Sequence, residues 1–206
     1  MNKEIIKRIL SSIILVPVAL FFILKGSIFF NSFISVCFLI AVYEWHNIPK
    51  KNIYNLFGFI FLILSFYSIY VLRNSLAGDY LYLLLITIIC VSSDIGGYIF
   101  GKTFKGPKLT KISPNKTYSG SIGAYLLSIV SVNFYLSNTY LNTETNFSKS
   151  IFLFVILVST VSQMGDILIS YFKRRSKIKN TGKIIPGHGG LLDRIDGMVF
   201  AFPFSY

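Results

Sequence analysis

Two aspartates near the C-terminus have the spacing of a metal-binding pair. Asp193 and Asp196 lie three residues apart, and if a helix begins near Leu191 they share one face of its first turn. Mg²⁺ prefers oxygen ligands, and one or two carboxylates commonly hold it together with substrate phosphates. The spacing therefore predicts a divalent-ion site, although solvated acids at a helix N-terminus would give the same pattern.

Two further acids lie inside long apolar runs. Asp94 and Asp166 stand five and six residues before the expected ends of their runs, which places each roughly 7 to 9 Å below the membrane surface. An acid within a spanning helix costs about 2.5 to 3.5 kcal/mol at mid-bilayer and usually faces a cavity or a partner. Because Asp94 and Asp166 are expected at the same depth, they suggest a second cation site. The alternative is that each acid pairs with a lysine of the loop that follows its own run.

A glycine-rich turn, Pro186-Gly187-His188-Gly189-Gly190, precedes the first aspartate pair. Glycines let backbone amides approach an anion closely, so the turn is a candidate phosphate cradle. The alternative is a flexible turn with an incidental histidine.

One apparent nucleotide motif is rejected. The segment from Gly96 to Thr103 satisfies the G-x-x-x-x-G-K-[ST] pattern of a phosphate loop. A true phosphate loop joins a buried strand to a helix, whereas this segment overlaps the end of an apolar run and its variable positions are bulky and apolar. We therefore expect no phosphate loop here.

The elements that position these residues must be membrane helices. The 206-residue chain is 53% hydrophobic and 14% charged, against about 45 to 50% and about 25% in soluble domains. The composition therefore disfavours a water-soluble domain. The aromatic content, with few soluble stretches, disfavours a nucleic-acid partner. Cys37 and Cys90 both lie in apolar runs and are expected to be small buried hydrophobes.

Six apolar runs approach the roughly 20 residues that are needed to cross a bilayer. The first follows basic residues as in a signal peptide but lacks a cleavage site, so we expect it to be retained. The last stretch, 198–206, is too short to cross. We predict an all-α, polytopic transmembrane helical bundle of about six full spans plus a short C-terminal helical stub, divided into N-terminal helices (1–80) and a catalytic region (81–206). The runs are Ile9–Leu24, Ser27–Tyr43, Ile53–Leu72, Leu81–Ile99, Ser121–Leu136 and Ile151–Phe172.

The net charge of +12 has two explanations. With a cytosolic N-terminus and six spans, 17 of the 20 Lys and Arg residues lie on the cytosolic side, as the positive-inside rule predicts. Two stretches, 100–120 and 173–183, are more basic than orientation requires and contain no acid. Such loops at a membrane face attract the phosphates of lipids or nucleotides.

The chain resembles the phosphatidate cytidylyltransferase family, the CDP-diacylglycerol synthases. The resemblance is strong from about residue 92 to residue 196 and weaker at Glu44-Trp45. The residues that match the family pattern are Ser113-Pro114-Asn115-Lys116-Thr117, Gly165-Asp166, Ser170, Lys173-Arg174, Lys179, Pro186-Gly187-His188-Gly189-Gly190 and Asp193-Arg194-Ile195-Asp196.

The resemblance implies cytidylyl transfer from CTP to phosphatidic acid with Mg²⁺, alone or with a monovalent cation. It also implies a multi-pass protein of a bacterial inner membrane with a cytosolic active site; a homodimer is one expectation for the oligomeric state. Among the implied roles, Asp166, Asp193 and Asp196 hold metal. Asp94 is a further metal candidate because it is expected at the same depth in the membrane as Asp166. Lys173, Arg174, Lys179 and Arg194 neutralise phosphates, and the nucleotide site contains Ser113, Lys116, Thr117, His188, Gly189 and Gly190.

Three features depart from the family pattern. Asn180 replaces an aspartate, Ser119 stands where a glutamate is usual, and the chain stops ten residues after Asp196, where members continue through a full last helix. A weakened enzyme, a degenerate homologue or transporter without activity, and a CTP-dependent polyprenol or phytol kinase are the alternatives.

Overall fold

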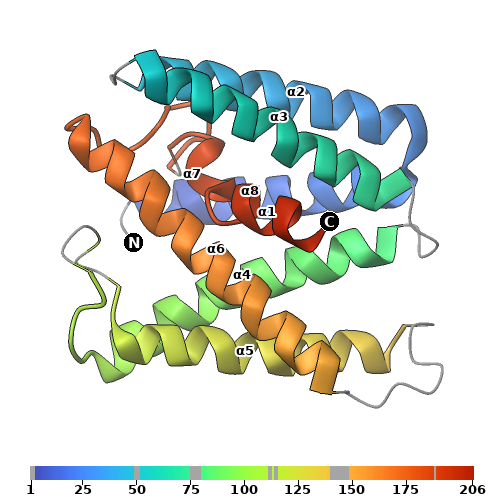
Figure 1. Cartoon of the computed structure of the whole chain (residues 1–206), viewed down its shortest axis with the longest axis vertical. Coiled ribbons are helices and arrows are strands. Elements are labelled where there is room, and N and C mark those ends of the chain that lie inside the picture. The colour runs from blue at the N-terminus through green and yellow to red at the C-terminus, as the bar shows by residue number, and fades with distance from the viewer. Residues whose placement is uncertain are drawn as a thin grey trace. The chain divides into compact units, whose positions relative to one another are not determined.

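The computed structural model describes residues 3–48, 52–74, 80–110, 113, 116–139, 149–187 and 189–206, without the side chains of residues 3–10, 12, 52 and 53. The described residues contain helices and two isolated bridges, and no strand (Figure 1). The helices are α1 (Lys3–Lys25), α2 (Ser27–Asn47), α3 (Asn52–Asn74), α4 (Tyr80–Phe104), α5 (Tyr118–Ser137), α6 (Lys149–Arg175), α7 (Leu192–Ile195) and α8 (Met198–Ser205).

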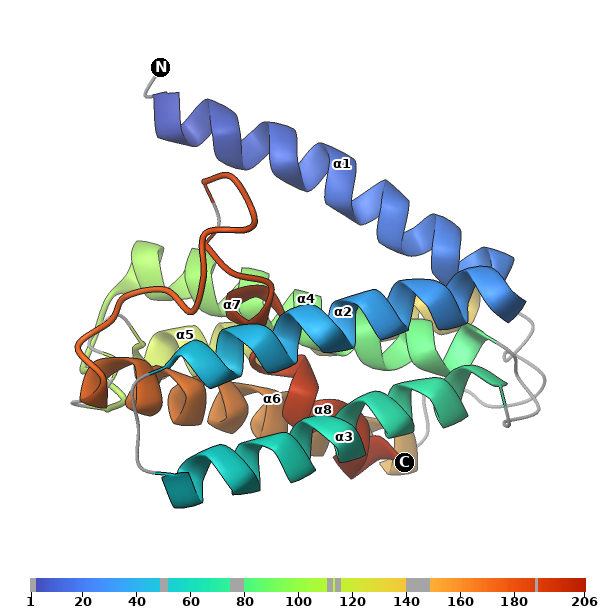
Figure 2. The same ribbon diagram turned by 90° about the horizontal axis from the view of Figure 1, so that it is seen from above.

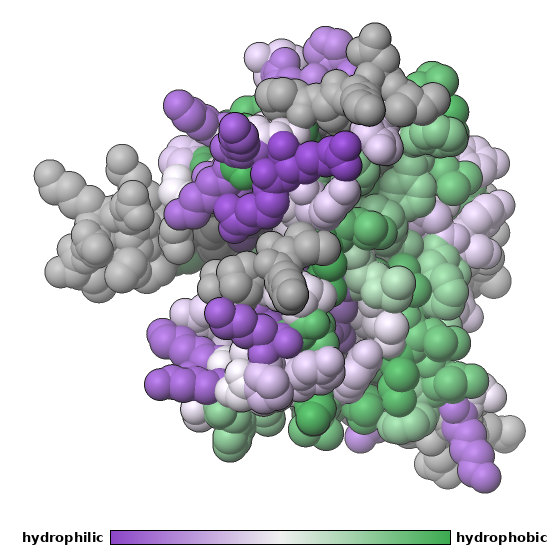
Figure 3. Space-filling view, turned by 60° about the vertical axis from the view of Figure 1, so that its left-hand side comes forward, coloured by the Kyte–Doolittle hydropathy of each residue, from purple (hydrophilic) through white to green (hydrophobic). Residues whose placement is uncertain are grey.

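All six predicted apolar runs are helical, which confirms the all-α fold class. Five helices, α2 to α6, are long and apolar enough to cross a membrane, and the apolar part of α1 over Ile13–Lys25 is shorter. Many large apolar side chains are exposed on these helices and form broad areas of the face drawn in Figure 3. Such exposure suits contact with lipid, so the chain is an integral membrane protein. The predicted C-terminal stub is α8.

The chain forms two compact units, and α6 contributes residues to both. The first unit comprises residues 1–81 and 172–196, and the second comprises residues 82–171 and 197–206. These two units are defined by which residues contact one another. The predicted division at residue 80 separates N-terminal helices from a catalytic region, and it stays a prediction.

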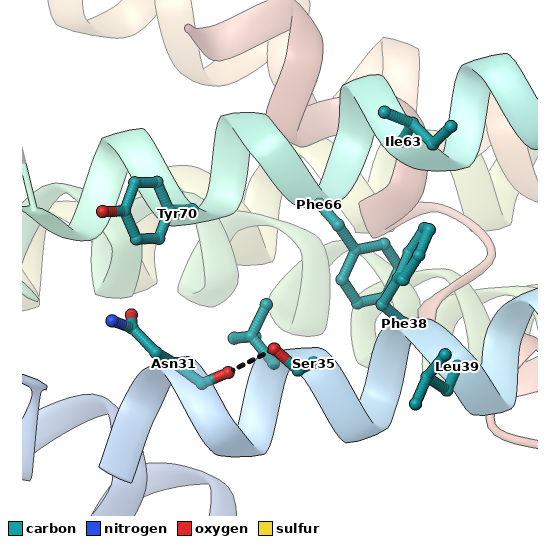
Figure 4. A pocket seen from close by; sticks show the side chains of 8 residues that line it. Asn31, Ser35, Phe38, Leu39, Ile63, Phe66 and Tyr70 are labelled. Atoms are coloured by element: carbon teal, nitrogen blue, oxygen red, sulfur yellow. Dashed lines mark hydrogen bonds between the residues drawn. The ribbon is translucent and has the colours of Figure 1, made fainter. Parts of the chain in front are cut away.

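In the first unit, α1 and α2 meet at a tight turn and separate away from it (Figure 2). Gly26 has φ of 68° there, a conformation that favours glycine. Helices α2 and α3 pack along their length, with the rings of Phe38 and Phe66 5.3 Å apart. A groove of about 470 Å³ lies between these helices, lined mainly by apolar side chains, with Asn31 and Tyr70 at one end (Figure 4).

In the second unit, α4 and α5 approach closely through small residues. A Cβ added to Gly120 would lie 2.8 Å from the Gly97 carbonyl oxygen, so the two backbones touch where side chains are absent. Helix α6 joins α4 through a hydrogen bond of 3.0 Å between the hydroxyls of Ser159 and Ser93. These contacts hold α4, α5 and α6 together in the second unit.

Candidate active site

The centre of the candidate site in the first unit is a lysine between two carboxylates. Lys173, in the last turn of α6, places its Nζ atom 2.9 Å from Asp193 Oδ1 and 3.6 Å from Asp196 Oδ2. The helix α7 begins at Leu192, as predicted, so the two aspartates do share a face. Their carboxylates therefore converge on one cationic group, which is the Lys173 ammonium.

The second oxygen of Asp193 holds the polypeptide in front of α7. Oδ2 accepts hydrogen bonds from the backbone N–H groups of Thr181, at 2.8 Å, and of Gly190, at 3.0 Å. The Asp193 side chain is only 5% exposed. One carboxylate thus connects the end of α6 to both ends of the segment 181–190.

Glycine is required within this segment. Gly187 and Gly189 have φ of 76° and 88°, and Gly189 also pairs with Ile185 through two backbone hydrogen bonds. A side chain at either position would be strained. The predicted glycine turn is therefore present as a compact reversal of the chain. His188, which the family resemblance assigns to the nucleotide site, lies outside the described residues.

The other basic residues predicted for this site are exposed. Arg174, Lys179 and Arg194 all have exposed side chains, as does Asn180, which replaces the family's aspartate. Exposed cations close in sequence to Lys173, Asp193 and Asp196 could meet an anionic ligand from solution. Their roles as phosphate ligands stay predictions.

Glu44 belongs to the same site and was not among the predicted site residues. It lies near the end of α2, is 1% exposed, and accepts hydrogen bonds from the hydroxyl of Thr181 and the backbone N–H groups of Leu191 and Leu192. The rule that an acid at the end of an apolar run needs a partner could have identified it, as it did Asp166.

The second unit contains a separate lysine–aspartate pair. Lys116 Nζ lies 2.5 Å from Asp166 Oδ2 and donates a hydrogen bond of 3.2 Å to the Gln163 carbonyl oxygen. The Ser170 hydroxyl donates to Asp166 Oδ1 at 3.3 Å. Both charged side chains are about one quarter exposed, so a ligand can reach this ion pair from solvent.

The loop before α5 contains other residues that were predicted for the nucleotide site, and hydrogen bonds fix their positions. The Thr117 hydroxyl accepts a hydrogen bond from Gly120 N–H at 3.1 Å and so caps α5. Ser119, which stands in place of the family's glutamate, donates to the Lys105 carbonyl oxygen. Ser113 accepts a hydrogen bond from the Lys116 amide through its carbonyl oxygen, at 3.0 Å. Ser119 therefore closes this loop, while Pro114 and Asn115 lie outside the described residues.

The two acids expected at matching depth differ in their surroundings. Asp94 is exposed on α4, whereas Asp166 is partly buried and pairs with Lys116. Within the described ranges, no three His, Cys, Asp or Glu side chains gather closely enough to hold a metal ion. The metal roles stay predictions.

The apparent phosphate loop is a helix. All residues from Gly96 to Thr103 belong to α4, so no loop of backbone amides is available to hold a phosphate, and the rejection is confirmed. Gly96 and Gly101 instead lie where α4 approaches α5: a Cβ on Gly101 would be 3.6 Å from the Gly120 Cα atom.

The fold and the site define a class: a polytopic helical membrane protein with lysine–carboxylate clusters next to basic, exposed segments. Such clusters suit the binding of polyphosphates, because lysines neutralise phosphate oxygens and carboxylates hold the accompanying cation.

Comparisons with known proteins give the family. The cytidylyltransferase family matches residues 49–206. The chain is 37% identical over 210 residues to the phosphatidate cytidylyltransferase of Rickettsia typhi, covering all of this chain and 92% of that protein. It is 32% identical over 148 residues to that of Bacillus subtilis, covering 71% of this chain and 54% of that protein. This chain therefore belongs to the cytidylyltransferase family.

Proposed function

We propose that this chain transfers the cytidylyl group of CTP to phosphatidic acid, giving CDP-diacylglycerol and pyrophosphate. The observation that supports the proposal best is the convergence of Asp193 and Asp196 on Lys173, within the part of the chain that matches the family. The relatives from Rickettsia typhi and Bacillus subtilis bear the name of this activity.

The reaction needs charge stabilisation more than proton transfer. An oxygen of the lipid phosphate attacks the α-phosphorus of CTP, a new P–O bond forms, and the bond from the α-phosphorus to the oxygen that bridges it to the β-phosphate breaks. Pyrophosphate leaves with the bonding electrons. A phosphate monoester is already an anion at neutral pH, so no general base is required. Lys173 and the exposed Arg174, Lys179 and Arg194 would neutralise the charge that develops on the leaving group.

The residues of this site fit Mg²⁺. Asp193 and Asp196 present carboxylate oxygens to a single cationic group, and oxygen ligands of this kind are those that Mg²⁺ prefers. We propose that Asp193 and Asp196 hold Mg²⁺, with a monovalent cation as a second ion. Asp166, in the second unit, is a separate candidate metal ligand. When bound, Mg²⁺ supplies charge neutralisation on the phosphates of CTP.

We place the active site on the cytosolic face of a bacterial inner membrane. The proposal rests on the positive-inside rule, because the basic segments 100–120 and 173–183 lie at the ends of spanning helices. A homodimer remains an expectation, and the mass of the detergent-purified protein by light scattering tests it.

The experiment compares two labels on CTP. Purified protein in detergent receives phosphatidic acid, Mg²⁺ and CTP labelled at either the α- or the γ-phosphate. Cytidylyl transfer puts the α-label into the lipid and the γ-label into pyrophosphate. A CTP-dependent lipid kinase, tested with a polyprenol acceptor, would put the γ-label into the lipid and contradict the proposal.

A further inference from the structure

Glu44 is connected to the segment that carries the candidate catalytic residues. Its carboxylate is buried and uses both oxygens: Oε1 accepts from Leu191 N–H at 2.9 Å, and Oε2 accepts from Leu192 N–H at 2.8 Å and from the Thr181 hydroxyl at 2.9 Å. These partners lie 137 to 148 residues further along the chain. Helix α2 thereby fixes the segment in front of α7.

Glu44 and Asp193 accept hydrogen bonds from neighbouring groups of that segment. Thr181 donates its backbone N–H to Asp193 and its hydroxyl to Glu44. Gly190 donates to Asp193, and the next two amides, of Leu191 and Leu192, donate to Glu44. The position of Asp193 relative to Lys173 therefore depends on a backbone conformation that Glu44 stabilises.

The packing around Glu44 is tight enough to define one arrangement. A Cβ added to Gly182 would lie 2.6 Å from Glu44 Oε1, and one added to Gly190 would overlap Glu44 Oε2. The carboxylate therefore occupies the space that side chains at both glycines would need. Glu44 lies just before residue 49, where the match to the family begins.

We infer that Glu44 is a positioning residue, which orients Asp193 toward Lys173 by holding Thr181, Leu191 and Leu192. The inference rests on the proposed function, because it treats Asp193 as part of the catalytic machinery. All three groups are donors, so a carboxylate can satisfy them together, whereas the amide of glutamine directs an N–H₂ group at one of them. A donor is then left without an acceptor in a buried place.

The test uses Glu44→Gln, Glu44→Asp and a control, Ser35→Ala. Ser35 lies on the same helix and its hydroxyl donates to the Asn31 carbonyl oxygen. We expect Glu44→Gln to lower kcat by about 100-fold, as misplaced catalytic groups do, and to leave KM for phosphatidic acid unchanged. Glu44→Asp keeps a full set of acceptors and should restore part of kcat, and Ser35→Ala should behave as wild type.

Limited trypsin digestion gives a readout that needs no activity. Lys183 is exposed within the segment 181–190 and Lys179 is exposed just before it, and Lys102 and Lys105 are exposed in the other unit as internal references. In Glu44→Gln, cleavage after Lys179 and Lys183 should be faster by about tenfold, as expected for a lost buried hydrogen bond of about 1.4 kcal/mol. Cleavage after Lys102 and Lys105 should keep its wild-type rate.

Two results would overturn the inference. One is a wild-type cleavage rate and kcat in Glu44→Gln; the other is equal acceleration at all four lysines, which would assign Glu44 to general stability. An inactive wild-type protein would contradict the proposed function, and the digestion would still decide whether Glu44 holds the segment.

Discussion

Lys173 and Asp193 form a nearly buried ion pair of 2.9 Å, with their side chains 12% and 5% exposed. A buried pair loses much of its Coulombic gain to desolvation, so it is weak evidence for stability. It does fix geometry: the end of α6 and the start of α7 are held together at the residues that we propose to bind phosphate and metal. The predictions below test what these contacts do.

Lys173→Met should destabilise the protein and stop turnover. Removing the cation leaves Asp193 and Asp196 without their shared partner, which costs about 3 kcal/mol for a buried pair. We expect a lower thermal midpoint in detergent, and at least about 100-fold lower kcat from the loss of an electrostatic group. Lys149→Met, which removes an exposed lysine at the start of the same helix, is the matched control and should change neither quantity. Equal losses in both variants would contradict the special role of Lys173.

Lys116 and Asp166 should act as a pair. Their ion pair of 2.5 Å predicts that Lys116→Met and Asp166→Asn each lower turnover, and that the double variant is no worse than the more damaging single one. The measurement is a double-mutant cycle on kcat/KM. Effects that simply add would show that the two residues act independently.

Gly190→Ala and Gly97→Ala should have opposite effects on stability. The methyl group at residue 190 would overlap Glu44 and the Thr181 hydroxyl, and such overpacking costs about 1 to 3 kcal/mol. At Gly97 the nearest atom would be 3.8 Å away, so alanine gains the helix preference of about 0.5 to 1 kcal/mol. Thermal denaturation in detergent measures both. A destabilising Gly97→Ala would contradict the described packing of α4.

Chelation should abolish activity reversibly. If carboxylates of the site hold Mg²⁺, then EDTA removes turnover and added Mg²⁺ restores it, while the thermal midpoint in the absence of CTP changes little because the site needs substrate phosphates to complete its ligands. Turnover that persists after exhaustive dialysis against EDTA would exclude the metal role.

Local features of the site were predictable from the sequence. The six apolar runs predicted the six long helices, because a segment that spans a membrane must form its backbone hydrogen bonds within itself. The spacing of Asp193 and Asp196 predicted that both lie on one face of a helix, because residues three apart are neighbours on a helix surface. Both inferences use neighbours along the chain.

Contacts between distant segments were not predictable in the same way. Lys116 and Asp166 are 50 residues apart, and Glu44 lies 137 residues before Thr181, so nothing in local spacing connects them. The structural role of Ser119, which stands in place of a glutamate, likewise became clear only from its hydrogen bond to the Lys105 carbonyl oxygen. Tertiary packing, which a single sequence does not display, decides these pairs.

The most direct test of the central claim is pyrophosphate release from CTP by the purified protein, with and without phosphatidic acid. We predict release that requires phosphatidic acid, equals the CDP-diacylglycerol formed, and falls at least about 100-fold in Asp193→Asn while the protein stays folded. No release at any concentration of lipid or Mg²⁺, or release that is independent of phosphatidic acid, would contradict the account.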